Sequence, residues 1–286
     1  MYQETFKTMS NPPKNIIDAG PLGRASEYPQ HYTPSLLHPI SRRDARSRIG
    51  FSEDISLHGE DLWTCYEFSW LNDKGLPRIA ILQLQVPLSS RSIVESKSLK
   101  LYLNSFAQTR FASVGDVQNT LDSDLKLAFM APLMISLQPP GQTQVTFNSL
   151  PGDLLDELDL EISDYEYDVG LLGKSEAGTY IKKSWCTDLF RSLCPVTSQP
   201  DWASLHIEYV GPEFDPRALL RYLVSYRNHQ AFHESTIEQI FLDIWSTYEP
   251  LELSVNGRFL RRGGIEINPF RSSQERAAPN MRLVRQ

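Results

Sequence analysis

Apolar and polar residues alternate along two neighbouring stretches in the first half of the chain. The first stretch runs from Leu62 to Trp70 and the second from Ile79 to Val86, and the residues Asn72-Asp73-Lys74-Gly75 lie between them. Alternation with a period of two predicts strands with one buried face, and Asn, Asp and Gly favour a turn between them. We therefore predict an antiparallel hairpin here.

A helical period follows the hairpin. Ser92 and Glu95 have the spacing of a capping box, which predicts that a helix opens there. Its buried face would carry Leu99, Tyr102, Leu103 and Phe106. A second helix is predicted at about 114–128, and residues 133–137 and 144–148 are predicted to pair as another hairpin.

The second half of the chain repeats the first. Residues 215–226 match residues 95–106 in type, residues 250–255 match 132–137, and residues 265–268 match 145–148. Such self-similarity indicates two copies of one supersecondary unit. Each copy is predicted to contain strand, strand, helix, helix, strand, strand. The predicted class is α+β, with antiparallel sheets and helices on one face.

The helices of the second copy have their own predicted starts. Asp215 and Pro216 combine a capping acid with a proline at the first helical position. Ser235 and Glu238 have capping-box spacing, and an apolar stripe at helical spacing runs from Ile237 to Tyr248.

The repeat divides the chain into three predicted parts. Residues 1–50 contain several prolines and little periodicity, so we expect an irregular N-terminal arm. Residues 51–170 form the first predicted module, and residues 171–286 form the second.

Eight acidic residues crowd residues 153–168. Leu158, Leu160 and Ile162 alternate with them, which favours a strand with one solvated face. A metal site is the open alternative for this run of carboxylates.

Charge and cysteine content narrow the classes of function. A formal net charge of −7 argues against a general surface for nucleic acid or anionic membranes. Cys65, Cys186 and Cys194 form no CxxC pair, which argues against a disulfide framework and a structural zinc site. The start lacks the apolar core of a signal peptide, and no apolar run approaches about 18 residues. We expect a soluble, cytoplasmic protein with Cys65 and Cys186 in structural roles.

Cys194 and Asp201 are the first candidates for chemistry. They flank a short loop that contains Pro195 and Pro200, and each proline restricts itself and the residue before it. A stiff loop that holds a thiol and a carboxylate suits covalent catalysis. The alternative is that Cys194 is a small buried hydrophobe.

Two predicted helix starts carry polar groups suited to a ligand. Ser96 and Lys97 follow Glu95, and a helix N-terminus with a lysine binds anions readily; otherwise Glu95 is only a capping partner. His233 and Glu234 precede the last helix, and a carboxylate there can accept two hydrogen bonds from a guanine-like edge. The alternative for this pair is an exposed loop.

Arg262 and Gly263 lie in the last predicted hairpin. Backbone N–H groups freed by glycine, together with an arginine fork, suit phosphate, although such an arginine can also be only solvated. The chain contains no GxGxxG or P-loop motif, so a dinucleotide would not be held by a Rossmann fold.

Taken together, four motifs resemble the NADPH-dependent 7-cyano-7-deazaguanine reductases, the nitrile reductases of queuosine biosynthesis. The motifs are Glu95 to Leu103, Cys194-Pro195 followed after four residues by Pro200-Asp201, Phe232-His233-Glu234, and Arg262-Gly263-Gly264. The resemblance extends from about Ser52 to Gln286, and the order of motifs is similar to that of the long, two-module members.

This resemblance implies two tandem tunnelling-fold modules of ββααββ order and a homodimer. It also implies a four-electron, NADPH-dependent reduction of 7-cyano-7-deazaguanine to 7-aminomethyl-7-deazaguanine, in the biosynthesis of queuosine in tRNA. Cys194 would attack the nitrile carbon and form a covalent thioimide, Asp201 would move the proton, and His233 would lie beside the reacting carbon.

The resemblance further assigns binding roles. The implied substrate-binding residues are Val94, Glu95, Ser96, His233 and Glu234. The implied cofactor-binding residues are Ser96, Lys97, Arg262 and Gly263, which would hold NADPH across a subunit interface. The implied reaction requires no metal.

Two other functions stay open on the sequence. A cyclohydrolase-like enzyme acting on a pterin precursor would need zinc held by Cys and His, and Cys186 and Cys194 lack a partner at such spacing. A non-catalytic purine-binding module would not be expected to keep the Cys, Asp, His and Glu set.

Overall fold

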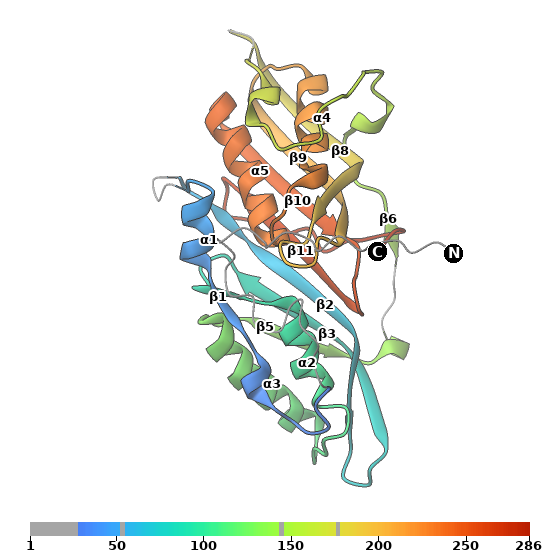
Figure 1. Cartoon of the computed structure of the whole chain (residues 1–286). Coiled ribbons are helices and arrows are strands. Elements are labelled where there is room, and N and C mark those ends of the chain that lie inside the picture. The colour runs from blue at the N-terminus through green and yellow to red at the C-terminus, as the bar shows by residue number, and fades with distance from the viewer. Residues whose placement is uncertain (1–27, 52–54, 143–145, 176–177) are drawn as a thin grey trace, which may run out of the picture.

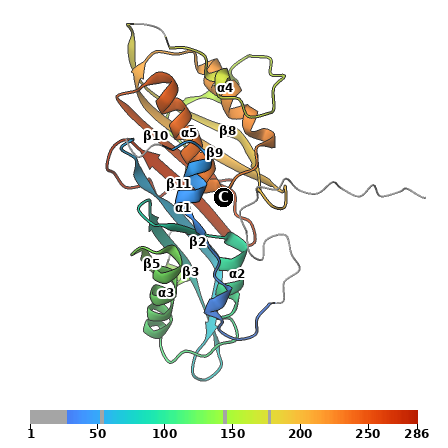
Figure 2. The same cartoon turned by 60° about the vertical axis from the view of Figure 1, so that its left-hand side comes forward.

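The centre of the molecule is a single eight-stranded sheet. The structure is a computed structural model and describes residues 28–51, 55–142, 146–175 and 178–286. The strand order is β5-β3-β2-β11-β10-β9-β8-β7, and neighbouring strands are antiparallel except for β7 and β8. Figures 1 and 2 show α2 and α3 over the first half of the sheet and α4 and α5 over the second.

The two halves contain corresponding elements. The first half has β2 (His58–Leu71), β3 (Pro77–Pro87), β4 (Ser92–Val94), α2 (Ser96–Asn104), α3 (Val114–Phe129) and β5 (Met134–Gln138). The second half has β8 (Tyr180–Leu193), β9 (Pro200–Pro212), α4 (Pro216–Ser225), α5 (His233–Tyr248), β10 (Glu252–Phe259) and β11 (Ile265–Ser272). The mixed α+β class and the first predicted hairpin, β2 and β3, are therefore confirmed.

The halves join where β2 pairs with β11. Their pairing runs from Cys65 opposite Ile265 to His58 opposite Ser272. On β11, Ile267 packs into the first core, and Arg271 contacts Glu238 of α5. Residues four apart on a strand point to the same face, so both pairs of helices cover one face of the sheet.

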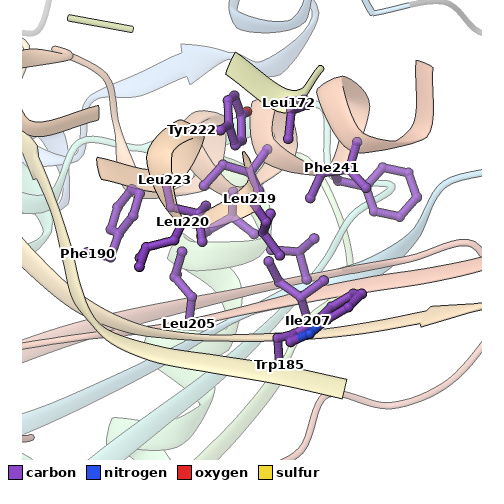
Figure 3. Packing of buried hydrophobic residues seen from close by; sticks show 14 of the residues in the cluster. Leu172, Trp185, Phe190, Leu205, Ile207, Leu219, Leu220, Tyr222, Leu223 and Phe241 are labelled. Carbon is purple, nitrogen blue, oxygen red and sulfur yellow. The ribbon is translucent and has the colours of Figure 1, made fainter. Parts of the chain in front are cut away.

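Each half has its own hydrophobic core. In the first, Trp63 of β2 packs with Tyr102 of α2 and Phe129 of α3. In the second, Leu205 of β9 packs with Leu219 of α4 in the cluster shown in Figure 3. The apolar periodicity of the helices and the alternation of the strands face each other across both cores.

A tyrosine–aspartate hydrogen bond at the same place in each half shows the repeat in atomic detail. Tyr102 Oη donates to Asp124 Oδ2 over 2.7 Å between α2 and α3. Tyr222 Oη donates to Asp243 Oδ2 over 2.5 Å between α4 and α5. The register also shifts at matching places, between Cys65 and Phe68 and between Thr187 and Phe190.

Both predicted capping boxes are wrong. Ser92 lies in β4, which is extended because it pairs with β1 (Pro39–Ser41), and α2 begins only at Ser96. Ser235 lies inside α5, which begins at His233 with no side-chain cap. Tertiary contacts at both places override the local capping signal.

The described part of the predicted N-terminal arm is more regular than expected. It contains a 3₁₀ turn (Pro34–Leu36), strand β1 and helix α1 (Arg42–Arg48), and the remainder of the arm, residues 1–27, lies outside the described residues. Ser41 caps α1 by accepting from the Asp44 N–H, and Arg42 forms a buried ion pair with Asp61. Ion pairs rather than a periodic apolar face hold α1 in place, so the pattern of apolar residues did not predict this helix.

The predicted hairpin of residues 133–137 and 144–148 does not form. Strand β5 pairs with β3, whereas β6 (Phe147–Asn148) pairs with β12 (Arg282–Leu283), and residues 143–145 lie outside the described residues. Residues 147–148 pair with the C-terminal strand β12 instead of with β5, so β5 remains an edge strand of the sheet.

The acidic stretch is not the strand that the alternation predicted. Only Asp153–Leu154 forms a strand, β7, and Leu155–Glu157 is a 3₁₀ turn. Leu158, Leu160 and Ile162 are half-buried against the second core without pairing to a strand. The alternation therefore marks an extended segment with one buried face. Among the described residues, no helix is long and apolar enough to cross a membrane.

Candidate active site

A cavity of about 340 Å³ lies at the junction of the two halves. Its lining from the first half comes from β2, β4 and the start of α2, and includes Trp63, Val94, Ser96, Lys97 and Lys100. Its lining from the second half comes from the β8–β9 loop, the start of α5 and the β10–β11 turn, and includes Cys194, Asp201, His233, Glu234, Arg262 and Gly263. Nine of the ten predicted site residues therefore line one cavity.

Cys194 begins the loop that joins β8 to β9. Its N–H donates to the Gln199 carbonyl over 2.9 Å, and its own carbonyl accepts from the Ser198 N–H over 3.1 Å. Ser198 has a left-handed φ of 54°, which closes the turn between these bonds. The thiol is only 4% exposed although it lines the cavity. The loop thus holds the sulfur in one place.

Asp201 is buried between two cationic or basic groups. Arg262 Nη1 lies 2.9 Å from Asp201 Oδ1, and His233 Nε2 lies 3.4 Å from the same oxygen. Neither contact has hydrogen-bond geometry, so Asp201 Oδ1 and Arg262 Nη1 have no hydrogen-bond partner among the described residues. A buried carboxylate with an open oxygen can still accept a proton from a neighbour or from a ligand.

His233 is the first residue of α5 and is oriented by stacking. Its ring lies parallel to that of Phe259, with centroids 3.8 Å apart and an interplanar angle of 5°. Its Nδ1 is buried with no hydrogen-bond partner in the described part of the chain. The ring therefore presents one edge to Asp201 and keeps a second nitrogen available inside the site.

Glu234 follows His233 in the first turn of α5 and is 5% exposed. Burial, and after it the negative charge of Asp61, raise the pKa of its carboxyl to about 7. His233 and Arg42 act in the opposite direction. Near neutral pH the side chain is therefore divided between a carboxylic acid and a carboxylate, and a ligand that donates to it would favour the carboxylate.

Glu95 is the predicted site residue that lies outside the lining. Its carboxylate caps α2 by accepting from the Lys97 N–H over 2.6 Å and the Ser98 N–H over 2.8 Å. Burial raises the pKa of this carboxyl in spite of these bonds. Glu95 thus holds the helix start from behind while Ser96 and Lys97 face the cavity.

Lys100 is a lining residue that the sequence reasoning missed. It lies one helical turn beyond Ser96 and Lys97, so helical spacing places it on the same face. A Cβ added to Gly263 would lie 2.0 Å from Lys100 Nζ, and Gly263 also has a φ of +58°. Glycine is therefore required in the turn for two reasons, and its absent side chain lets the lysine reach the cavity.

Some lining residues were not candidates from the sequence. Trp63, Ile93 and Ile267 lie in strands β2, β4 and β11, and their apolar side chains alone do not distinguish them from core residues. Phe232, the first residue of the Phe232-His233-Glu234 motif, also lines the cavity. Across the described residues, no group of three or more His, Cys, Asp or Glu is placed to hold a metal ion.

Comparison with known proteins identifies the family of this chain. Residues 28–137 match a family described as nitrile reductase, 7-cyano-7-deazaguanine-reductase N-term, and residues 200–278 match one described as QueF-like protein. A solved structure of the archaeosine synthase QueF-Like in the apo form aligns over 35% of this chain with a TM-score of 0.30 and 15% identity, which is too weak to support an argument.

Relatives of nearly the same length are much closer. A protein of Paraburkholderia phymatum is 44% identical over 94% of this chain and 99% of its own length. One of Burkholderia ambifaria is 46% identical over 93% of this chain and 98% of its own. Both are named NADPH-dependent 7-cyano-7-deazaguanine reductase. The chain therefore belongs to the family of NADPH-dependent 7-cyano-7-deazaguanine reductases.

Proposed function

We propose that this protein reduces the nitrile of 7-cyano-7-deazaguanine to the primary amine of 7-aminomethyl-7-deazaguanine. The change takes up four electrons and four protons. Two NADPH supply two hydrides, and the other two protons come from solvent through acidic groups of the site. The observation that carries the proposal is the single cavity in which Cys194, Asp201, His233 and Glu234 of one half meet Ser96 and Lys97 of the other. Family membership over almost the whole chain supports the substrate and the cofactor.

Cys194 is the proposed nucleophile. The sulfur forms a bond to the nitrile carbon, one π bond of the C≡N group breaks, and the nitrogen takes up a proton to give a thioimide. An ordinary thiol is mostly protonated near neutral pH, so a base must remove its proton. Asp201 lines the same cavity with an open Oδ1, and it is proposed to take the thiol proton and deliver it to the nitrogen.

Five residues are proposed to hold NADPH, whose chemistry is to deliver a hydride to the substrate carbon. Lys97, Lys100 and Arg262 bring three cations to the cavity, and Ser96 lines it at the start of α2, where Glu95 already accepts from the Lys97 and Ser98 N–H groups. The three cations fit a phosphorylated dinucleotide because charged donors bind phosphate. Gly263 keeps the turn open around Lys100 and so belongs to the same proposed set.

The purine-like ring is proposed to lie against Glu234. A carboxylate accepts two hydrogen bonds, which matches the N1–H and 2-amino group of a guanine-like edge. Val94 and Ser96 line the same cavity from the first half, while Glu95 would act on the substrate through the helix start that it caps. His233 would lie near the reacting carbon because its ring is held beside Asp201.

The same reasoning extends to the assembly and its setting. We propose that residues 51–170 and 171–286 are two tunnelling-fold modules, preceded by an arm at residues 1–50. The matching order of two strands, two helices and a further strand in both halves supports this division. A cytoplasmic homodimer that acts in queuosine biosynthesis is proposed from the family.

Consumption of NADPH in the presence of 7-cyano-7-deazaguanine tests this function. We expect two NADPH to be oxidised for each aminomethyl product, detected by absorbance and by mass spectrometry of the product. An unrelated aromatic nitrile of similar size is the control and should cause no NADPH oxidation. Absence of turnover with the purified full chain and the deazaguanine nitrile would refute the proposed function.

A further inference from the structure

A chain of charged, mostly buried side chains lies near Glu234, and none of them lines the cavity. Arg42 Nη2 lies 2.8 Å from Asp61 Oδ2, and Arg271 Nη1 lies 2.8 Å from Asp61 Oδ1. Arg271 Nε then donates to Glu238 Oε2 over 3.1 Å, and Glu238 also pairs with Arg46. Arg271 is fully buried, and Asp61 is 1% exposed. We call these five residues the charge network.

The charge network joins four elements that are distant in sequence. Arg42 and Arg46 come from α1, Asp61 from β2, Arg271 from β11 and Glu238 from α5. Burying ions costs free energy, and apolar side chains of similar size often serve stability at least as well. A buried charge network of this size beside a candidate active site therefore indicates a role in function in addition to stability.

The charge network reaches Glu234 both through the backbone and through charge. Arg271 Nη2 lies 3.5 Å from the Glu234 carbonyl oxygen, in the first turn of a helix that has no side-chain cap. The negative charge of Asp61 raises the pKa of the Glu234 carboxyl, whereas the positive charge of Arg42 lowers it. One network thus supports the helix start and acts on the ionisation of the side chain it carries.

We propose that Asp61, Arg42 and Arg271 are positioning residues that hold Glu234 against the purine and set the charge its carboxyl presents to it. This inference rests on the proposed function, because it takes Glu234 as the acceptor for the guanine-like edge. The carboxylate form accepts from N1–H and from the 2-amino group together, whereas the acid form has lost one of these acceptor positions. Substrate binding should therefore weaken as the pH falls through the pKa of Glu234.

Charged groups face Glu234 from every element around it. Asp61 and Arg42 face it from β2 and α1, and His233 precedes it on α5. Arg271 approaches from β11, and Glu238 lies one turn further along α5. The remaining charged groups of the cavity are Lys97, Lys100, Asp201 and Arg262. Two members of the charge network, Asp61 and Arg42, act on the pKa of Glu234, and they act with opposite signs.

The opposite signs provide the test. Affinity for 7-cyano-7-deazaguanine would be measured by calorimetry from about pH 5.5 to about pH 8, a range that includes the Glu234 pKa of about 7. The measurement would omit NADPH and use a Cys194→Ala background, which prevents covalent reaction. We expect Asp61→Asn to move the acid limb of the affinity profile to lower pH. We expect Arg42→Gln to move it to higher pH. Each shift should be up to about one pH unit, equivalent to about tenfold in Kd on the acid limb.

A surface arginine supplies the matched control. Arg276 pairs with Glu208 at an exposed position outside the cavity, so Arg276→Gln should leave the midpoint unchanged. Thermal unfolding of each variant reports whether it is folded. If Asp61→Asn fails to fold, the upward shift expected of Arg42→Gln decides the matter alone.

The outcomes separate the two claims. If the Cys194→Ala parent binds no 7-cyano-7-deazaguanine at any pH, the proposed function is wrong. If the parent binds and the midpoints of both variants equal that of the parent, or move in the same direction, the positioning role is wrong while the function stands. A purely structural network would weaken binding equally at all pH values, without moving the midpoint in opposite directions.

Discussion

The two halves of this protein have the same scaffold and carry different chemistry. Helix α2 begins behind Glu95 and helix α4 begins behind Asp215, and each carboxylate caps its helix. The residues after the cap differ, because Ser96 and Lys97 line the cavity in the first half, whereas Pro216 and Arg217 in the second do not.

In the connections between the first two strands, it is the second half that carries the candidate residue. In the first half, β2 and β3 are joined by a tight turn in which Asn72 accepts from Gly75. In the second half, the connection of β8 to β9 is the loop that carries Cys194. The helix start proposed to bind NADPH therefore comes from one copy, and the proposed nucleophile comes from the other. Repetition of a scaffold leaves the functional residues of each copy free to differ, provided that the copies meet in one site.

The largest expected effect comes from removing the Cys194 thiol, which lies in a loop that has no counterpart in the first copy. Cys194→Ala should lower turnover by at least about 10³-fold, as loss of other covalent nucleophiles does. Intact-protein mass spectrometry should show the substrate adduct on the parent and none on this variant. Cys186→Ala, at a buried cysteine of β8 outside the cavity, is the control and should still form it. An adduct on Cys194→Ala would show that the nucleophile is another residue.

The next effect concerns proton movement in the same copy. Asp201→Asn should lower kcat by about 10²-fold or more, since the amide cannot take up the thiol proton. The Kd for substrate should stay near that of the parent, because Asp201 is not proposed to hold the ring. Stopped-flow and equilibrium binding would separate the two quantities. Unchanged turnover would remove Asp201 from the reaction.

A smaller effect is expected for the first copy. Lys97→Ala removes one cation from the proposed phosphate grip and should raise the KM for NADPH about tenfold or more, the range for a hydrogen bond to a charged group. Arg217→Ala, at the corresponding place on α4, is the matched control and should leave that KM unchanged. Equal effects of the two changes would contradict the division of labour between the copies.

The smallest expected effect is the loss of stability on removing a helix cap, which should be similar in both copies. Asp215→Ala removes a cap on α4 and should cost about 1 kcal/mol of stability without changing either KM. Glu95→Ala should cost a similar amount and also raise both KM values, because the cap it removes holds Ser96 and Lys97 in the cavity. Denaturant unfolding and steady-state kinetics measure the two consequences. If Glu95→Ala alters stability alone, the helix start has no part in binding.

Periodicity predicted most of the strands and helices that enclose the two hydrophobic cores. The hairpin of β2 and β3, the helix at 114–128 and the internal repeat all follow from alternation or helical spacing, and the structure confirms them. Helix α1 could not be predicted in this way, because Arg42 and Arg46 hold it through ions from strands and helices far along the chain. The acidic segment was wrongly predicted as a strand. An extended segment that buries one face shows the same alternation of apolar and polar residues whether or not it pairs with a neighbouring strand.

Motifs predicted which residues would lie in the site, but they did not predict how these residues meet. Lys100 was missed although it lies within the motif from Glu95 to Leu103, because only the first residues of that motif were assigned ligand-binding roles. The contact of Arg262 with Asp201 was not predictable, because it depends on the β10–β11 turn lying beside the β8–β9 loop. The charge network also depends on pairing between β2 and β11, whose residues are about two hundred positions apart.

That distance has a consequence for the nascent chain. Arg271 and Glu60, which meet across β2 and β11, are separated by 211 positions. At roughly 5–20 residues per second, β2 leaves the peptidyl-transferase centre roughly 10–40 s before its β11 partner. During that interval β2 can pair with β3, but its other edge stays open, and an open edge invites pairing with other chains. Chaperone protection should therefore matter most for translation intermediates that end before Ile265.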